Sequence, residues 1–178
     1  MNPAESSDYL SRKGQYERWV VYMRHALKIA CSSPQKPFGA ILVHTVTGEI
    51  ISEGFNSTDE DPILHAEIAA IHNCARRTAK LPWQELELYT TAEPCAMCQC
   101  AIEFARIPFV CYGTSSSWLQ QHGWRQIGIQ AEEVIRRTSW SKTVIVGGIL
   151  ADECNALLEA ARSQCKPSIS TISPYADA

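Results

Sequence analysis

Two short motifs bring together residue types that can bind a metal ion: H-A-E at 65–67 and P-C-A-M-C at 94–98. Residues three apart share a face of a helix, so Cys95 and Cys98 can hold one cation between their sulfurs. We expect both in the first turn of a helix, where the positive end of the helix dipole favours thiolate. His65 is expected to begin another helix. If both helix starts point to the same spot, His65, Cys95 and Cys98 supply three ligands to one zinc ion.

Three protein ligands leave one position for water, which is typical of a catalytic zinc. Two thiolates neutralise most of the charge of the ion, so the bound water needs a base, and Glu67 is placed to take and return its proton. The alternatives are a buried or thioredoxin-like pair for Cys95 and Cys98, and a surface carboxylate for Glu67. Each motif alone is weak, whereas both in this order, with proline before the first cysteine, are expected on the order of 0.01 times by chance.

The elements that must position these residues alternate between helix and strand. Apolar spacing and helix propensity predict helices over 15–30, 65–79, from Pro94 to about 105, over 131–137 and over 150–164. Apolar β-branched runs predict strands over 38–44, 49–54, 86–91, 108–113 and 143–149, the first two joined as a hairpin. About 30 residues separate the last two strands. That length suits a crossover between parallel strands.

These elements predict one α/β domain over 1–178, with helices packed on the faces of the sheet and flexible segments at about 1–12 and 165–178. With 46% apolar residues, 20% charged residues and a net charge of -3, the chain is not disordered. It carries no export signal or membrane span, so we expect a cytoplasmic protein that does not contact a membrane. Of the other cysteines, Cys100 lies on a different face from the ligand pair, and we expect buried thiols at Cys31, Cys74, Cys111, Cys154 and Cys165.

H-A-E followed by P-C-x-x-C resembles the signature of the zinc-dependent cytidine and deoxycytidylate deaminase superfamily. The stretches PFGAILV, DPILHAEIAAI and LYTTAEPCAMCQCAIEFARI are similar to the branch that contains bacterial guanine deaminases and tRNA adenosine deaminases. This resemblance implies a three-layer α/β/α cytidine-deaminase-like fold, a five-stranded mixed sheet with its last two strands parallel, one Zn²⁺ per chain and a homodimer. It also implies substrate contacts, which we assign to Asn56, Ala66, Glu93 and Pro94.

The expected reaction removes an exocyclic amine from a nucleobase or nucleoside and releases ammonia. P-F-G-A is closer to the guanine deaminases and favours a free, guanine-like purine. The alternatives are wobble adenosine in tRNA, a cytosine nucleoside or nucleotide, and a zinc domain without activity that binds nucleic acid or a protein. Residues 119–178 contain six Lys/Arg and six Asp/Glu, so we expect any tRNA binding to be weak. Candidates for a lid or for stacking on the base are Phe104, Trp118, His122 and Trp124.

Overall fold

A computed structural model describes residues 3–77, 82–140 and 143–164 of the chain. Five strands form one mixed sheet in the order β2-β1-β3-β4-β5. The strands are β1 (Gly39–His44), β2 (Ile50–Phe55), β3 (Leu86–Ala92), β4 (Phe109–Thr114) and β5 (Val144–Val146). β1 pairs antiparallel with β2 and β3, whereas β3, β4 and β5 are parallel. The crossover predicted from the length of the last connection is therefore confirmed.

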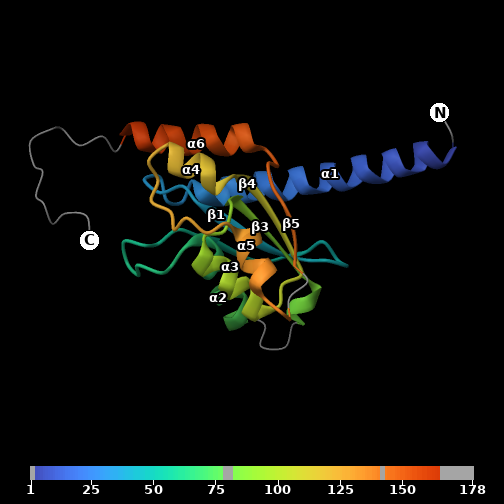
Figure 1. Ribbon diagram of the computed structural model, residues 1–178, viewed down its shortest axis with the longest axis horizontal. Coiled ribbons are helices and arrows are strands. Elements are labelled where there is room, and N and C mark those ends of the chain that lie inside the picture. The colour runs from blue at the N-terminus through green and yellow to red at the C-terminus, as the bar shows by residue number, and fades with distance from the viewer. Residues whose placement is uncertain (1–2, 78–81, 141–142, 165–178) are drawn as a thin grey trace, which may run out of the picture.

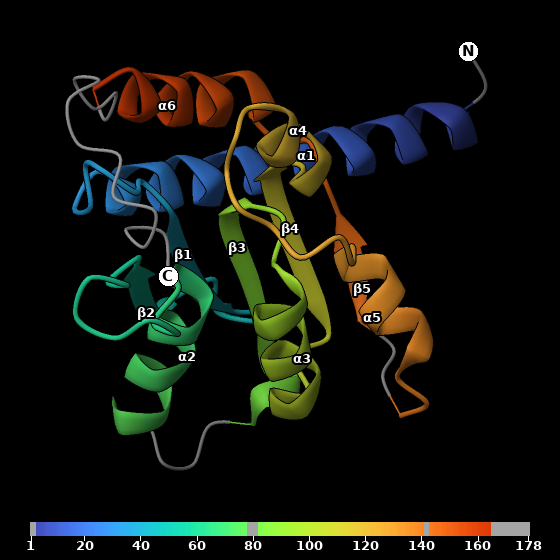
Figure 2. The ribbon, with the colours of Figure 1, turned by 60° about the vertical axis from the view of Figure 1, so that its left-hand side comes forward.

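Helices cover both faces of this sheet and make three layers (Figures 1 and 2). The helices α1 (Pro3–Ala30) and α6 (Ala151–Gln164) lie on one face, and α2 (Ala66–Arg77) and α3 (Ala96–Ala105) lie on the other. The connection from β4 to β5 carries α4 (Ser116–Gln121) and α5 (Ala131–Arg137), and the 3-10 helix η1 (Trp83–Glu85) precedes β3. The α/β/α fold predicted from the sequence is confirmed. No helix in the described part of the chain is long and apolar enough to cross a membrane.

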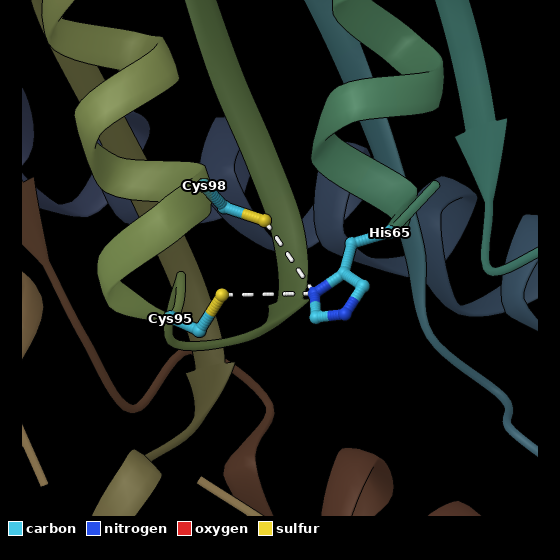
Figure 3. A group of neighbouring side chains, drawn as sticks. All are labelled: His65, Cys95 and Cys98. Carbon is cyan, nitrogen blue, oxygen red and sulfur yellow. Dashed lines mark hydrogen bonds between the residues drawn. The ribbon is translucent and has the colours of Figure 1, made fainter. Parts of the chain in front are cut away.

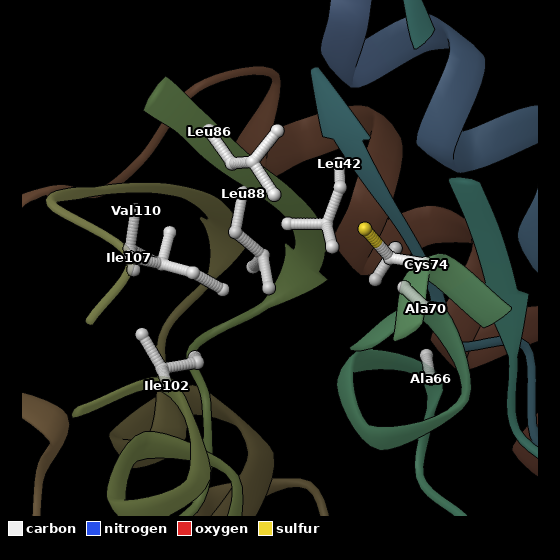
Figure 4. Close-up of a cluster of buried hydrophobic side chains, with 10 residues drawn as sticks. Leu42, Ala66, Ala70, Cys74, Leu86, Leu88, Ile102, Ile107 and Val110 are labelled. Atoms are coloured by element: carbon white, nitrogen blue, oxygen red, sulfur yellow. The ribbon is translucent and has the colours of Figure 1, made fainter. Parts of the chain in front are cut away.

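A hydrophobic core lies between the sheet and the helices α2 and α3 (Figure 4). It fixes the positions of these two helices, which begin within the H-A-E and P-C-A-M-C motifs. Leucines of β1 and β3 pack there against small residues of α2 and against Ile102 of α3. Gly54 of β2 lets α2 come close, because a Cβ at this position would lie 2.3 Å from the backbone nitrogen of Ala70. Any larger residue at position 54 would therefore displace the helix that follows His65.

Several element boundaries differ from the predicted ones. α1 begins at Pro3, twelve residues before its predicted start, and proline suits the first turn of a helix. The flexibility expected for 1–12 stays a prediction, and the expected tail at 165–178 lies outside the described residues. β5 is shorter than predicted because the chain leaves the sheet at two glycines, of which Gly148 has a φ of 81°. α4 was not predicted.

Cysteine burial follows the prediction with one exception. Cys74, Cys111 and Cys154 are buried, and Cys100 is exposed. Cys31 was expected in the core but is exposed, because it follows the last residue of α1, where the chain turns at the surface. Cys165 lies outside the described residues.

Candidate active site

Two helix starts carry the predicted metal ligands, as the sequence indicates. His65 directly precedes α2, and Cys95 is the N-cap residue of α3, with Cys98 in the first turn of the same helix. Pro94 precedes this cap and is not part of the first turn, so only Cys98 of the two cysteines is helical, contrary to the prediction. Figure 3 shows the two sulfurs and the imidazole turned toward one another.

The geometry of the three donors fits zinc. Nδ1 of His65 lies 3.6 Å from Sγ of Cys95 and 3.6 Å from Sγ of Cys98, and all three donor atoms lie within 4.8 Å of one another. Tetrahedral zinc, with bonds of about 2.05 Å to nitrogen and about 2.3 Å to sulfur, places such atoms about 3.6 Å apart. His65, Cys95 and Cys98 therefore form a zinc site with room for one further ligand.

The electrostatics of the site favour a bound cation. The hydrogen bond from Cys98 lowers the pKa of the Cys95 thiol to about 4, and His65 acts in the same direction. The same contact, together with burial, raises the pKa of Cys98, and the hydrogen bond to Cys95 raises the pKa of His65. The three side chains share protons through their hydrogen bonds. A doubly charged metal ion displaces these protons when it binds.

Glu67 lies beside the metal ligands and is buried at 6% exposure. Burial raises the pKa of its carboxyl group above the usual value, and the nearby Cys95 adds to this effect. Its Oε1 accepts a hydrogen bond from the Thr90 hydroxyl, at 3.1 Å. Thr90 is itself buried on β3, and no motif in the sequence pointed to it. The hydroxyl holds one oxygen of the carboxylate in place at the wall of the cavity.

A cavity of about 440 Å³ opens in front of these groups, within the size range of small-molecule sites. His65, Glu67 and Cys95 line its floor together with Asn56. Oδ1 of Asn56 accepts hydrogen bonds from the backbone nitrogen and the hydroxyl of Thr58, at 3.2 and 2.9 Å. The amide nitrogen Nδ2 of Asn56 thus remains the group that can donate to a ligand.

The walls of the cavity are aromatic and its rim is basic. Phe38 and Trp124 meet edge to face, with ring centroids 5.1 Å apart, and both line the cavity. Lys36, Arg125 and Arg162 also line it. None of these three cations was predicted as a site residue, because they come from segments without any recognisable motif.

Glu93 lines the cavity but binds mainly the protein itself. Its two carboxylate oxygens accept hydrogen bonds from the backbone nitrogens of Ser116, at 2.8 Å, and Ala131, at 3.1 Å. These are the first residues of α4 and α5. The substrate contact predicted for Glu93 therefore stays a prediction, whereas its role in anchoring the connection between β4 and β5 is visible in the structure.

Of the other candidates for substrate contact, only Trp124 is among the residues that line the cavity. Ala66 and Pro94 are buried, and their assignment to substrate stays a prediction. Trp118 stacks on His122, with ring centroids 3.8 Å apart, and neither lines the cavity. Phe104 is 75% exposed and lies against Trp140, also outside the cavity. Trp124 alone among the four lid or stacking candidates lines the cavity.

Comparison with known proteins places these residues in a family context. Residues 17–114 match the family described as cytidine and deoxycytidylate deaminase zinc-binding region. A tRNA-specific adenosine deaminase of Rickettsia bellii is 33% identical over 142 residues, which cover 77% of this chain and 94% of that protein. That relative and this chain therefore correspond over nearly the whole length of the relative.

Solved structures show the same fold. A guanine deaminase from Nitrosomonas europaea superimposes with a TM-score of 0.72 at 21% identity and covers 81% of this chain and 84% of its own. A structure from a study of A-to-I editing by tRNA:A34 deaminases has a TM-score of 0.64 at 29% identity, with 77% of this chain and 98% of that one covered. Both likenesses support the α/β/α arrangement around the metal site.

Proposed function

Because the chain belongs to the cytidine and deoxycytidylate deaminase zinc-binding family, we propose that this zinc deaminase acts on adenosine in RNA, with the wobble position of tRNA as its target. The observation that carries the chemistry is the buried Glu67 beside the three zinc ligands, at the floor of a cavity. The tRNA-specific relative, 33% identical, supports RNA over the free purine expected from P-F-G-A. The reaction consumes one water and releases one ammonia for each inosine formed.

Glu67 and Asn56, which line the cavity, each have a part in this reaction. When bound, zinc with three protein ligands keeps a position for water and lowers the pKa of that water. Glu67 accepts one proton from the attacking water and passes it to the ring nitrogen, and then carries the second proton, from the hydroxyl group formed at the attacked carbon, to the amine that leaves as ammonia. Its pKa, raised by burial, suits a group that must hold this proton for a moment. Asn56 donates from Nδ2 to an acceptor on the edge of the base.

A free, guanine-like purine is the second candidate substrate. It is favoured by Phe38, whose ring forms the aromatic wall of the cavity with Trp124 and could flank a purine without any contact to ribose or phosphate. Cytosine nucleosides are less well supported, because β4 and β5 are parallel, which is the arrangement implied by the resemblance to the purine and tRNA branch. A domain that only binds zinc would have no use for a buried proton acceptor at Glu67.

We also propose that the chain acts as a homodimer in the cytoplasm, as expected from its family and from its sequence. Phe104, in the last turn of α3, and Trp140 form an exposed aromatic pair, and they are candidates for that contact. Sedimentation of the purified protein, with and without a charge at position 104, tests the assignment. A monomer at micromolar concentration would contradict it.

Turnover assays test the proposed reaction. Purified protein is incubated with tRNA, with an anticodon stem–loop RNA, and with guanine, adenine, cytosine and their nucleosides, and ammonia and converted base are measured. We expect inosine in the RNA. Glu67→Ala should retain its zinc and lose activity by roughly 10²- to 10⁴-fold. Conversion of guanine with untouched RNA would replace the first candidate by the second, and loss of metal from Glu67→Ala would show that Glu67 is structural.

A further inference from the structure

The guanidinium group of Arg162 lies at the rim of the active-site cavity, far in sequence from the zinc motifs. Arg162 belongs to the last turn of α6 and is exposed. Its Cζ lies 5.7 Å from the ring centroid of Trp124, and both residues line the cavity. A cation over a tryptophan face is attracted by the ring, so this contact favours a position of the exposed guanidinium beside the cavity.

The backbone at Gly123 leaves the space that Arg162 occupies. Gly123 has a φ of 78°, a conformation that L side chains rarely adopt. A Cβ at this position would lie only 2.5 Å from Nη2 of Arg162. Glycine therefore permits both the turn into Trp124 and the close approach of the guanidinium.

Arg162 has no ion-pair partner among the residues that the structure describes. Within residues 3–77, 82–140 and 143–164, no carboxylate lies within ion-pair distance of Arg162. Lys36, which lines the same cavity, differs from Arg162 in that its ammonium group is paired with Asp59 at 2.6 Å. The two carboxylates that line the cavity are engaged elsewhere, Glu67 by the Thr90 hydroxyl and Glu93 by backbone nitrogens.

We propose that Arg162 binds a phosphate group attached to the nucleoside that is deaminated or to its neighbour, and thereby selects phosphate-bearing substrates over free bases. The inference rests on the proposed function. A guanidinium presents two parallel N–H groups that match phosphate oxygens, and the contact with Trp124 places this group beside the cavity. The phosphate comes either from an RNA strand or from a nucleoside 5′-monophosphate.

The test compares Arg162→Ala and Arg162→Lys with the wild-type protein. Arg76→Ala is the matched control, because Arg76 is exposed on α2, carries the same charge and does not line the cavity. KM and kcat are measured for an adenosine-containing stem–loop RNA and for the free nucleosides and bases over a range of salt concentrations. Binding of inosine-containing RNA, inosine 5′-monophosphate and inosine is measured separately, without turnover.

We expect Arg162→Ala to weaken binding of phosphate-bearing ligands by roughly 10- to 100-fold, the effect of one charge-assisted contact, with a raised KM and little change in kcat. The salt dependence of RNA binding should fall by about one phosphate contact. Inosine and free bases should bind as before, and Arg162→Lys should keep the salt dependence but lose part of the affinity. Loss for RNA alone identifies the strand as the source of the phosphate, and loss for the monophosphate as well identifies the nucleotide itself.

Two results would overturn the inference: equal losses for ligands with and without phosphate, which indicate a structural role, or losses no larger than those of Arg76→Ala. These results are distinct from a failure of the proposed function. If the wild-type protein converts only free bases, RNA deamination is wrong, and the binding measurements with inosine 5′-monophosphate and inosine then decide the role of Arg162 by themselves.

Discussion

The Thr90 hydroxyl donates a hydrogen bond to Oε1 of Glu67, at 3.1 Å, and both side chains are buried. Hydrogen bonds to charged groups contribute more than those between neutral groups. Thr90→Val keeps the shape of the side chain and removes the donor, so we expect kcat to fall by roughly 10- to 100-fold with unchanged zinc content. Thr90→Ser should restore most of the rate. A fully active Thr90→Val protein would show that Glu67 needs no such support.

Loss of one sulfur should empty the metal site. The wild-type protein should carry about one zinc per chain, and Cys98→Ala should lose it, because a site with two remaining protein ligands binds zinc far more weakly. Metal analysis after extensive dialysis measures this. Cys100→Ala is the control, since its thiol is exposed and lies outside the ligand group. Stoichiometric zinc in Cys98→Ala would mean that the ligands are wrongly assigned.

Glu93→Gln should destabilise the protein. The carboxylate accepts backbone hydrogen bonds from both Ser116 and Ala131, whereas an amide offers a single oxygen. One buried N–H group is then left without an acceptor, which costs about 1–3 kcal/mol of unfolding free energy. Urea denaturation of the zinc-loaded protein measures it. Glu132→Gln removes the same charge at an exposed site of α5 and should change stability by less than about 0.5 kcal/mol.

The thiols should differ sharply in reactivity. Burial raises the pKa of Cys111 and of Cys154 to about 12. A raised pKa keeps the thiol protonated at lower pH, so the reactive thiolate is scarce throughout pH 7–9 and increases only as the pH approaches 12. Alkylation followed by peptide mass spectrometry should label the exposed Cys31 and Cys100 first. Rapid labelling of Cys111 in folded protein at pH 8 would contradict the structure.

The zinc site was predictable because its ligands lie in two short sequence motifs. Motif spacing places His65, Cys95 and Cys98 at two helix starts, and the length of the last connection alone predicts the parallel β4–β5 pair. The substrate side of the cavity was not predictable in this way. Arg162 reaches it only because α6 lies beside Gly123 and Trp124, a tertiary contact that no pattern along the chain reports.

The weak tRNA binding expected from the charge balance stays a prediction, because a count of charges does not locate them in the fold. Equal numbers of basic and acidic residues in 119–178 predicted weak binding of tRNA. In the structure Arg125 and Arg162 line one cavity, while Glu93, which also lines it, accepts hydrogen bonds from backbone nitrogens. A count of charges cannot distinguish a carboxylate that faces a ligand from one that anchors a loop.

The connection between β4 and β5 separates the zinc-binding part of the chain from later residues that also line the cavity. The family match ends at 114, the last residue of β4, so the zinc ligands and Glu67 lie before the crossover, whereas Trp124, Arg125 and Arg162 lie after its start. Glu93 connects the two parts. It lies near the metal ligands in the sequence, and its carboxylate accepts hydrogen bonds from the first residues of both α4 and α5. Substitutions at Trp124, Arg125 or Arg162 therefore change the cavity lining without touching the zinc ligands, so exchanging the segment after 114 between relatives would test how far it sets the choice of substrate.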